Sequence, residues 1–129
     1  MENLKFLVVD DSTTMRRIVI NSLKSLGYES VAEAADGREA LQKLLAEGAG
    51  FVITDWNMPE MNGLELTKAI RANDQFIDLP ILMVTTRAFK EDVVEAMKAR
   101  VNNYIIKPFT PQGLKEKIEQ ILKSTTAPA

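Results

Sequence analysis

The sequence FVITDWNMPE, residues 51–60, begins as a short apolar run and then breaks into an acid, a tryptophan, an asparagine and a methionine-proline pair. The run FVIT is too short for a helix and is typical of a strand buried in a sheet. Asp55 follows it directly, and a carboxylate at the end of a buried strand costs free energy unless something pairs with it. Either this strand ends at the surface or Asp55 has a chemical role.

Four other short apolar runs predict further strands. They lie at residues 4–9, 30–34, 81–85 and 103–107, and most are rich in β-branched or aromatic residues. Between the runs, apolar residues recur at helical spacing. Five strands that alternate with five helices indicate right-handed crossovers and helices on both faces of the sheet. The sequence therefore predicts an α/β fold with a doubly wound, five-stranded parallel sheet.

Capping residues agree with this division. Asp36 is placed to cap the second helix, and Gly48 lies near the end of that helix. Gly27 follows the first helix, and Pro111 stands where the first turn of a helix accepts proline. We expect one domain over residues 1–124 and a frayed tail over residues 125–129.

The composition excludes several classes of function. The chain has 129 residues, 46% hydrophobic and 26% charged, and its net charge of −2 offers no overall attraction to nucleic acid or to a membrane surface. It contains no cysteine and no histidine, so disulfides, thiolate metal sites and imidazole catalysis are absent. No segment resembles a signal peptide or a membrane span. We expect a cytoplasmic protein, monomeric by default.

Polar residues follow the predicted strands at the edge where parallel α/β sheets bind their ligands. Those that end the first, third, fourth and fifth strands are Asp10, Asp11, Asp55, Thr85, Thr86 and Lys107. Each has an ordinary interpretation when taken alone: an acid as a helix cap, a threonine as a strand former, a lysine as a solvated side chain. Three acids at one edge are harder to explain in this way.

The electrostatics of the three acids predict a cation among them. Two carboxylates about 4 Å apart repel by roughly 4 kcal/mol at an effective dielectric constant near 20. Lys107 neutralises one charge only, and oxygen ligands without nitrogen or sulfur favour Mg²⁺. Asp55 is then a candidate nucleophile toward phosphorus, with Lys107, the metal and a threonine hydroxyl stabilising the phosphoryl oxygens. This chemistry needs neither histidine nor cysteine on the chain.

Four motifs resemble, in order and spacing, the receiver domains of two-component signalling. They are VVDDS (8–12), TDWNMPEMNG (54–63), MVTT (83–86) and YIIKPF (104–109). The likeness covers nearly the whole chain and is greatest to the CheY type of chemotaxis response regulator. It implies a flavodoxin-like receiver fold with strand order 2-1-3-4-5. It also implies a phosphoacceptor switch that catalyses only its own phosphorylation and dephosphorylation.

The resemblance assigns roles to individual residues. It implies that Asp55 is phosphorylated by a CheA-like histidine kinase. Lys107 would contact the phosphoryl group and Thr85 would hydrogen-bond to it. The implied ligands of Mg²⁺ are Asp10, Asp11, Asp55 and the backbone carbonyl of Asn57.

The same resemblance implies a switch and an output surface. Tyr104 would move inward as Thr85 is drawn toward the phosphate, and the Lys107–Pro108 bond is a candidate cis peptide. The face made by the fourth helix, fifth strand and fifth helix, with Lys90, Tyr104 and Lys115, would bind the flagellar motor switch protein FliM and so control rotation. A phosphatase is a further possible partner. Trp56 would be a surface aromatic beside the site, or a partly exposed packing residue.

Two departures from the family pattern affect these expectations. Arg87 replaces a glutamate of some chemotaxis receivers and Thr86 is larger than the frequent alanine, so we hypothesise altered access of water or phosphatase to the site. Arg100 stands where many receivers have glycine after the fourth helix. We expect that turn to take its left-handed residue from Asn102 or Asn103.

Other functions remain open at this point. The chain could be a phosphorelay intermediate or a receiver with an output other than motility. A Mg²⁺-dependent phosphohydrolase with an aspartate nucleophile, of the haloacid dehalogenase type, would use similar groups, but its first-strand acids are spaced D-x-D and here they are adjacent. A flavodoxin-like FMN carrier is opposed by the acids, which would repel the FMN phosphate.

Overall fold

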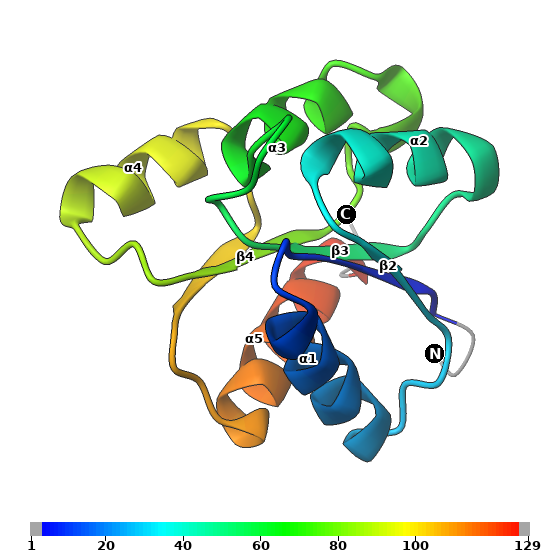
Figure 1. The fold of residues 1–129 in the computed structure, drawn as a ribbon, viewed down its shortest axis with the longest axis vertical. Coiled ribbons are helices and arrows are strands. Elements are labelled where there is room, and N and C mark those ends of the chain that lie inside the picture. The colour runs from blue at the N-terminus through cyan, green and yellow to red at the C-terminus, as the bar shows by residue number, and fades with distance from the viewer. Residues whose placement is uncertain (1–3, 127–129) are drawn as a thin grey trace.

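Five parallel strands form one sheet in the order β2-β1-β3-β4-β5 (Figure 1). The structure is a computed structural model that describes residues 4–126. Its strands are β1 (Phe6–Val9), β2 (Val31–Ala34), β3 (Phe51–Thr54), β4 (Ile81–Thr85) and β5 (Asn103–Ile106). The predicted fold class and strand order are confirmed, and the predicted strand bounds differ from these by at most two residues.

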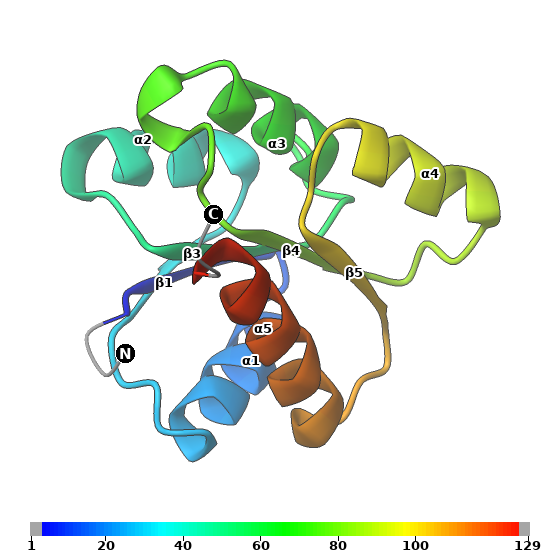
Figure 2. The same cartoon turned by 180° about the vertical axis from the view of Figure 1, so that it is seen from behind.

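Helices cover both faces of the sheet. They are α1 (Thr13–Ser25), α2 (Gly37–Glu47), α3 (Gly63–Arg71), α4 (Lys90–Lys98) and α5 (Pro111–Thr126), with a 3₁₀ turn η1 (Asp74–Phe76) after α3. Figures 1 and 2 show α2, α3 and α4 on one face and α1 and α5 on the other. Helix α5 runs two residues into the expected tail, and residues 127–129 lie outside the described residues. Within residues 4–126, no helix is both long and apolar enough to cross a membrane.

Alternate residues of each strand face the two helical layers, because successive side chains of a strand point to opposite sides. In β1, Phe6 and Val8 pack toward α1 and α5, whereas Leu7 and Val9 pack toward α2 and α3. All four are at most 1% exposed. The inner strands β1 and β3 are buried along their whole length, so the residues that follow them are the first to reach the edge of the sheet.

The predicted helix boundaries at Asp36, Gly48, Gly27 and Pro111 are confirmed. The Asp36 side chain accepts a hydrogen bond from the backbone N–H of Glu39, and Gly48 and Gly27 have φ values of 76° and 99°. Pro111 is the first residue of α5. Asp36 and Pro111 thus mark helix starts that follow strands β2 and β5, whereas Gly27 and Gly48 mark helix ends that precede strands β2 and β3.

The expectation for the turn after α4 is wrong. Arg100 itself is left-handed, with φ 75°, and neither asparagine takes that role. The backbone N–H of Arg100 donates to Met97 and that of Val101 donates to Ala96, the hydrogen-bond pattern that commonly ends a helix at a left-handed residue. The guanidinium of the buried Arg71 donates twice to the Arg100 carbonyl, at 3.0 and 2.8 Å. These bonds offset the strain of a non-glycine residue at positive φ.

Candidate functional site

Asp10 and Asp55 are brought together by the register of β1 and β3. Val9 pairs with Thr54, so the next residue of each strand emerges at the same edge of the sheet. The Asp55 backbone N–H donates to the Val9 carbonyl at 2.9 Å and extends this pairing by one step. Asp10 is 4% exposed, and the Asp55 side chain is 12% exposed. The two carboxylates therefore lie at the boundary between the core and the solvent, where an unpaired charge destabilises the folded state.

Lys107 supplies the positive charge between these two acids. Its Nζ donates to Asp10 Oδ2 and to Asp55 Oδ2, both at 3.0 Å. Burial alone would lower the pKa of Lys107, but hydrogen bonds and charge attraction from Asp55 and Asp10 outweigh it and raise the pKa. The Lys107–Pro108 bond is cis, as predicted. An ammonium that is fixed in this way is a preformed contact for a further anionic group on Asp55.

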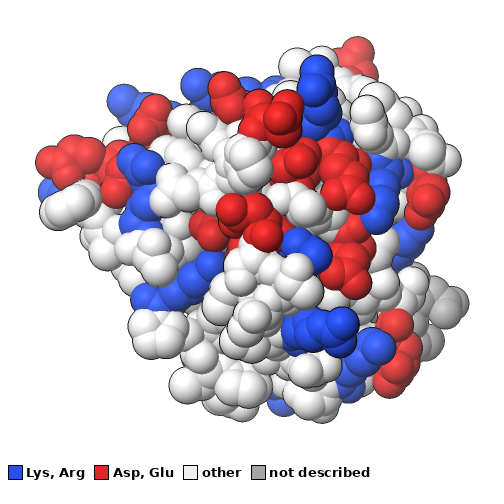
Figure 3. Space-filling model, in the orientation of Figure 1, with Lys and Arg blue, Asp and Glu red and all other residues white. Residues whose placement is uncertain are grey.

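Asp11 completes an acidic cluster that fits a divalent cation. Carboxylate oxygens of Asp10, Asp11 and Asp55 all lie within 4.8 Å of one another. One ammonium leaves two of the three negative charges uncompensated, and oxygen ligands of this kind suit Mg²⁺. Ser12, and neither acid, caps α1 through a hydrogen bond from the Met15 N–H, so the ordinary interpretation of Asp10 and Asp11 as caps is wrong. Figure 3, in the orientation of Figure 1, shows acidic side chains gathered near the centre of the surface in view, with basic side chains beside them.

The loop after β3 is held close to the backbone of Asp55. Asp55 Oδ1 accepts a hydrogen bond of 2.5 Å from the Trp56 N–H, which leaves Oδ2 to Lys107. Gly63 begins α3 and donates its N–H to the Trp56 carbonyl at 2.8 Å. A Cβ at Gly63 would lie 1.9 Å from the Asp55 carbonyl oxygen. Only glycine permits this approach, which fixes the orientation of the Asp55 backbone.

Arg16 is a supporting residue that the sequence interpretation missed. Its guanidinium donates to the Asp10 carbonyl at 2.6 Å and to Glu33 Oε1 at 2.8 Å. Asp10 Oδ1 in turn accepts from the Ser12 N–H at 2.9 Å. These bonds tie the turn that carries both first-strand acids to α1 and β2. The helical spacing from Ser12 places Arg16 one turn into α1, above that turn, and this was the available signal.

Thr85 and Tyr104 lie on the adjacent strands β4 and β5. Thr85 pairs with Ile106 and Met83 pairs with Tyr104, so the two residues are two register positions apart. Thr85 is fully buried, and its Oγ1 accepts from the Arg87 N–H at 3.4 Å. Tyr104 is buried, and its hydroxyl donates to the Arg87 carbonyl at 2.8 Å. Burial and the nearby Asp92 raise the pKa of Tyr104 to about 12. The tyrosine is thus inward in this structure, and Thr86 is exposed.

Comparison with known proteins now identifies the arrangement. The sequence pattern of the family described as the response regulator receiver domain matches residues 6–119. The chain belongs to the response regulator receiver domain family. Members of this family are phosphoacceptor switches rather than conventional enzymes, and they bind Mg²⁺ at an acidic pocket such as the one formed by the three acids.

Relatives of this receiver domain include chemotaxis proteins. Chemotaxis protein CheY1 of Helicobacter pylori (strain J99) is 59% identical over 120 residues, which cover 92% of this chain and 97% of the relative. The chemotaxis protein CheY homolog of Campylobacter jejuni (strain 81-176) is 58% identical over 120 residues, 92% of each chain. The protein is therefore a CheY-like receiver domain of two-component signalling, related to those of chemotaxis.

Solved receiver structures agree with this assignment. CheY4 of Vibrio cholerae has a TM-score of 0.85 at 39% identity, covering 92% of this chain and 98% of its own. The CheY-like receiver domain protein from Methanospirillum hungatei has a TM-score of 0.85 at 32% identity, covering 95% and 97%. The receiver fold is thus matched along nearly the whole chain.

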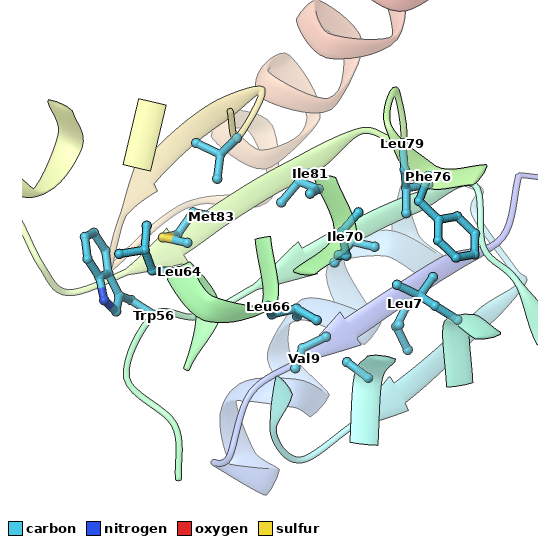
Figure 4. Packing of buried hydrophobic residues seen from close by; sticks show 14 of the residues in the cluster. Leu7, Val9, Trp56, Leu64, Leu66, Ile70, Phe76, Leu79, Ile81 and Met83 are labelled. Atoms are coloured by element: carbon cyan, nitrogen blue, oxygen red, sulfur yellow. The ribbon is translucent and has the colours of Figure 1, made fainter. Parts of the chain in front are cut away.

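The receiver's single tryptophan is placed differently from the expectation of a surface aromatic. Trp56 is 4% exposed and lies in the core cluster beside Leu64 and Met83 (Figure 4). The guanidinium of Arg87 lies over its ring, with Cζ 4.2 Å from the centroid. The indole is buried because α3 packs behind it and Arg87 covers the remaining side. The alternative, a partly exposed packing residue, was nearer the outcome, but nothing in the sequence indicated that Arg87 would cover the ring.

The predicted output residues lie on three adjacent elements of the receiver. Lys90 is the first residue of α4, Tyr104 lies in β5 and Lys115 lies in α5. The side chain of Asn57 contacts Arg87 through Oδ1 at 3.2 Å, and the role of its backbone carbonyl stays a prediction. The partner surface also stays a prediction; its residues lie on β5, at the edge of the sheet, and on the helices before and after it in the sequence.

Proposed function

We propose that this receiver domain is a switch of chemotaxis whose Asp55 accepts a phosphoryl group from a CheA-like histidine kinase. The observation that carries the proposal is the position of Lys107 Nζ, 3.0 Å from oxygens of both Asp10 and Asp55. Such an arrangement compensates charge that grows at Asp55 when a phosphoryl group arrives. Of the two carboxylates that Lys107 contacts, that of Asp55 is the more exposed, at 12% against 6% for Asp10, which favours Asp55 as the acceptor.

The chemical step is a transfer between two nucleophiles. An oxygen of the Asp55 carboxylate forms a bond to phosphorus while the P–N bond of the kinase phosphohistidine breaks, and the electron pair returns to the imidazole nitrogen. The product is an acyl phosphate on Asp55. Asp10, Asp11, Asp55 and the Asn57 carbonyl would hold Mg²⁺, which supplies positive charge to the phosphoryl oxygens. Lys107 supplies the remaining compensation and keeps the Asp55 oxygen oriented.

The switch is proposed to connect Asp55 with the output surface through Thr85 and Tyr104. Thr85 ends β4 and its hydroxyl hydrogen can be donated to a phosphoryl oxygen, whereas Oγ1 here accepts a long bond from Arg87. Tyr104 lies on the neighbouring strand and contacts the loop that follows Thr85. A movement of Thr85 would therefore be felt at the tyrosine through that loop.

The output is proposed to be binding of the flagellar switch protein FliM to the α4, β5 and α5 surface, which includes Lys90, Tyr104 and Lys115. Four large apolar side chains on or next to α4 and β5 are solvent-exposed: Phe89, Val94, Met97 and Ile106. Exposed apolar groups beside lysines suit an amphipathic acidic peptide. A phosphatase would act on the same phosphorylated form, and transfer to a second histidine in a relay is the alternative output.

The test follows the fluorescence of the single tryptophan, which adjoins Asp55. Mg²⁺ is added first and then acetyl phosphate or beryllofluoride, with Asp55→Asn as the matched variant and a FliM N-terminal peptide as the ligand. The proposal predicts a response to Mg²⁺, a second response that needs Asp55, and tighter peptide binding after it. Absence of the Asp55-dependent response would remove the switch. A response without any change in peptide affinity would favour a relay or another output.

A further inference from the structure

Arg87 joins more parts of the site than any role assigned above requires. Its guanidinium stacks on Trp56 at 4.2 Å and donates to Asn57 Oδ1 at 3.2 Å and to Asp92 Oδ1 at 2.9 Å. Trp56 and Asn57 belong to the loop that carries Asp55, and Asp92 lies in the first turn of α4. The Arg87 side chain therefore bridges the phosphoacceptor loop and the helix that begins the output surface.

The backbone of the same residue contacts both switch residues. The Arg87 N–H donates to Thr85 Oγ1 at 3.4 Å, and the Arg87 carbonyl accepts from the Tyr104 hydroxyl at 2.8 Å. Tyr104 is 8% exposed, with its hydroxyl directed at that carbonyl. The acceptor of the buried hydroxyl thus sits in a loop whose position depends on where the Arg87 side chain is anchored. A buried phenol without an acceptor would be unfavourable.

We propose that Arg87 is a positioning residue that anchors the loop between β4 and α4 so that its carbonyl holds Tyr104 inward before Asp55 is phosphorylated. The inference deepens the proposed function, since it rests on Tyr104 being the switch. Arg87 would bias the unphosphorylated domain toward the inward tyrosine rather than follow phosphorylation. A ligand or modification that also favours the inward tyrosine then produces a smaller change in the inward population, because that population is already high.

The anchor is built from contacts of moderate strength. The side chain of Arg87 is 37% exposed and that of Asp92 is 13% exposed, so their ion pair is partly screened. Arg87 Nε is buried with no hydrogen-bond partner among the described residues. The stacking of the guanidinium on Trp56 is therefore partly offset by the cost of this unsatisfied donor. Loss of one cation–π contact and one partly exposed ion pair corresponds to about a tenfold change in the inward population.

The experiment reads the environment of Tyr104 in unphosphorylated protein. Tyr28→Phe is made first, which leaves Tyr104 as the single tyrosine. Nitration by tetranitromethane at near-neutral pH then reports how often the ring is exposed, and intact mass gives the rate. Arg87→Ala is expected to raise this rate by about tenfold and Asp92→Asn by less, because only one contact of the anchor is lost. Lys68→Ala, which removes a positive charge from an exposed position of α3, is the matched control and should leave the rate unchanged.

A titration of Tyr104 gives a second readout with opposite signs for the two explanations. Burial and Asp92 raise the pKa of Tyr104, the charge of Arg87 lowers it and Asp55 raises it. If Arg87 acts only by its charge, Arg87→Ala raises the pKa further. If Arg87 positions the loop, the ring leaves its buried site and the pKa falls toward the usual value of about 10.

An unchanged nitration rate in Arg87→Ala, or a pKa that rises, would overturn the proposal. Arg87→Lys keeps the charge but cannot contact Asn57 and Asp92 together, and it should behave more like Arg87→Ala than like the parent. Circular dichroism of each variant establishes that the fold is retained. No phosphoryl donor is present, so failure of Asp55 to accept phosphate would leave these results unaffected and would be recognised separately.

Discussion

The Lys107 ammonium and the Asp55 carboxylate form a direct ion pair, with Nζ 3.0 Å from Oδ2, although the two residues are 52 positions apart in the sequence. The pair is mostly shielded from solvent, with side-chain exposures of 10% and 12%. Lys107 shares the same ammonium with Asp10. A metal cation bound at this site would therefore compete with the Lys107 ammonium for the carboxylates of Asp10 and Asp55. A phosphoryl group on Asp55 would be stabilised by both positive charges.

Replacement of Lys107 separates these two effects. In Lys107→Met we expect Mg²⁺ to bind several-fold more tightly, because three acids then have no internal cation. Phosphoryl uptake from acetyl phosphate should fall by about a hundredfold, since a fixed charge at the developing anion is lost. Calorimetry gives the first quantity and intact mass against time gives the second. Lys123→Met, an exposed lysine of α5, is the control. Uptake at the parent rate in Lys107→Met would contradict the role of this lysine.

Arg16 should be needed for metal binding, although it contacts only the backbone carbonyl of Asp10 and none of the three carboxylates of the site. Its bond to the Asp10 carbonyl fixes the turn that carries Asp10 and Asp11. Loss of such an outer contact weakens metal binding by about tenfold or more, and we expect this for Arg16→Ala in a Mg²⁺ titration. Arg17→Ala changes the charge equally at an exposed neighbouring position and should have little effect. Equal losses in the two variants would mean that charge alone, and not positioning, is responsible.

The lifetime of phosphorylated Asp55 should depend on Arg87. The side chain covers Trp56 and contacts Asn57, both adjacent to Asp55, so it screens one approach to the acyl phosphate. We expect Arg87→Glu, which is repelled by Asp92, to open that approach and to speed dephosphorylation by roughly threefold to tenfold, or about 1 kcal/mol. The decay of the phosphorylated mass in Mg²⁺ measures the rate. An unchanged decay rate would refute this hypothesis.

The left-handed Arg100 offers a stability test. A glycine accepts φ 75° without strain, so Arg100→Gly should raise the free energy of unfolding by about 0.5–1 kcal/mol, after its own larger loss of chain entropy. Arg100→Ala removes the charge next to Arg71 but keeps the strain. The difference between the two variants in urea unfolding therefore isolates the backbone term. If Arg100→Gly is no more stable than Arg100→Ala, the turn is not strained.

Tyr104 should make the protein sensitive to alkali. Its pKa in the folded state is about 12, above the value of about 10 expected in the unfolded chain, so the folded state favours the neutral phenol. The stabilisation is fully present below pH about 10 and is lost as the pH rises toward about 12. Tyr104→Phe should show a smaller loss of unfolding free energy over that range than the parent. Tyr28→Phe is the comparison, since the pKa of Tyr28 is also raised. An identical pH dependence in Tyr104→Phe and the parent would contradict the inward, neutral tyrosine.

The sequence was sufficient for the sheet and for the residues at its edge. Apolar runs of four or five residues fix the strands because parallel strands are buried on both faces, and the residue after each run must then emerge at one edge. Asp10, Asp55 and Lys107 could be placed together on that ground alone. Their common hydrogen bonds were not predictable, because they depend on the rotamer of a long lysine side chain.

The errors came from long side chains and from one backbone turn. Trp56 was expected to be a surface aromatic, as the resemblance implies, or a partly exposed packing residue, but it is 4% exposed and Arg87 from another loop covers it. Arg100 was not expected to be left-handed, because a β-carbon disfavours that conformation and the compensating bonds come from Arg71, 29 positions earlier. Arg16 and Arg87 act through contacts between separate elements; helical spacing placed Arg16 near the turn that carries Asp10, but it did not reveal the contacts themselves.

The central claim is that Asp55 is the phosphoryl acceptor in a Mg²⁺-dependent reaction, and peptide mapping tests it most directly. The protein is incubated with a phosphorylated CheA-like kinase, with Mg²⁺ or with excess chelator, and the acyl phosphate is trapped by borohydride reduction before digestion. The account predicts one modified aspartate, Asp55, only with Mg²⁺, and none in Asp55→Asn. Labelling of another residue, or labelling that persists in Asp55→Asn, would contradict it.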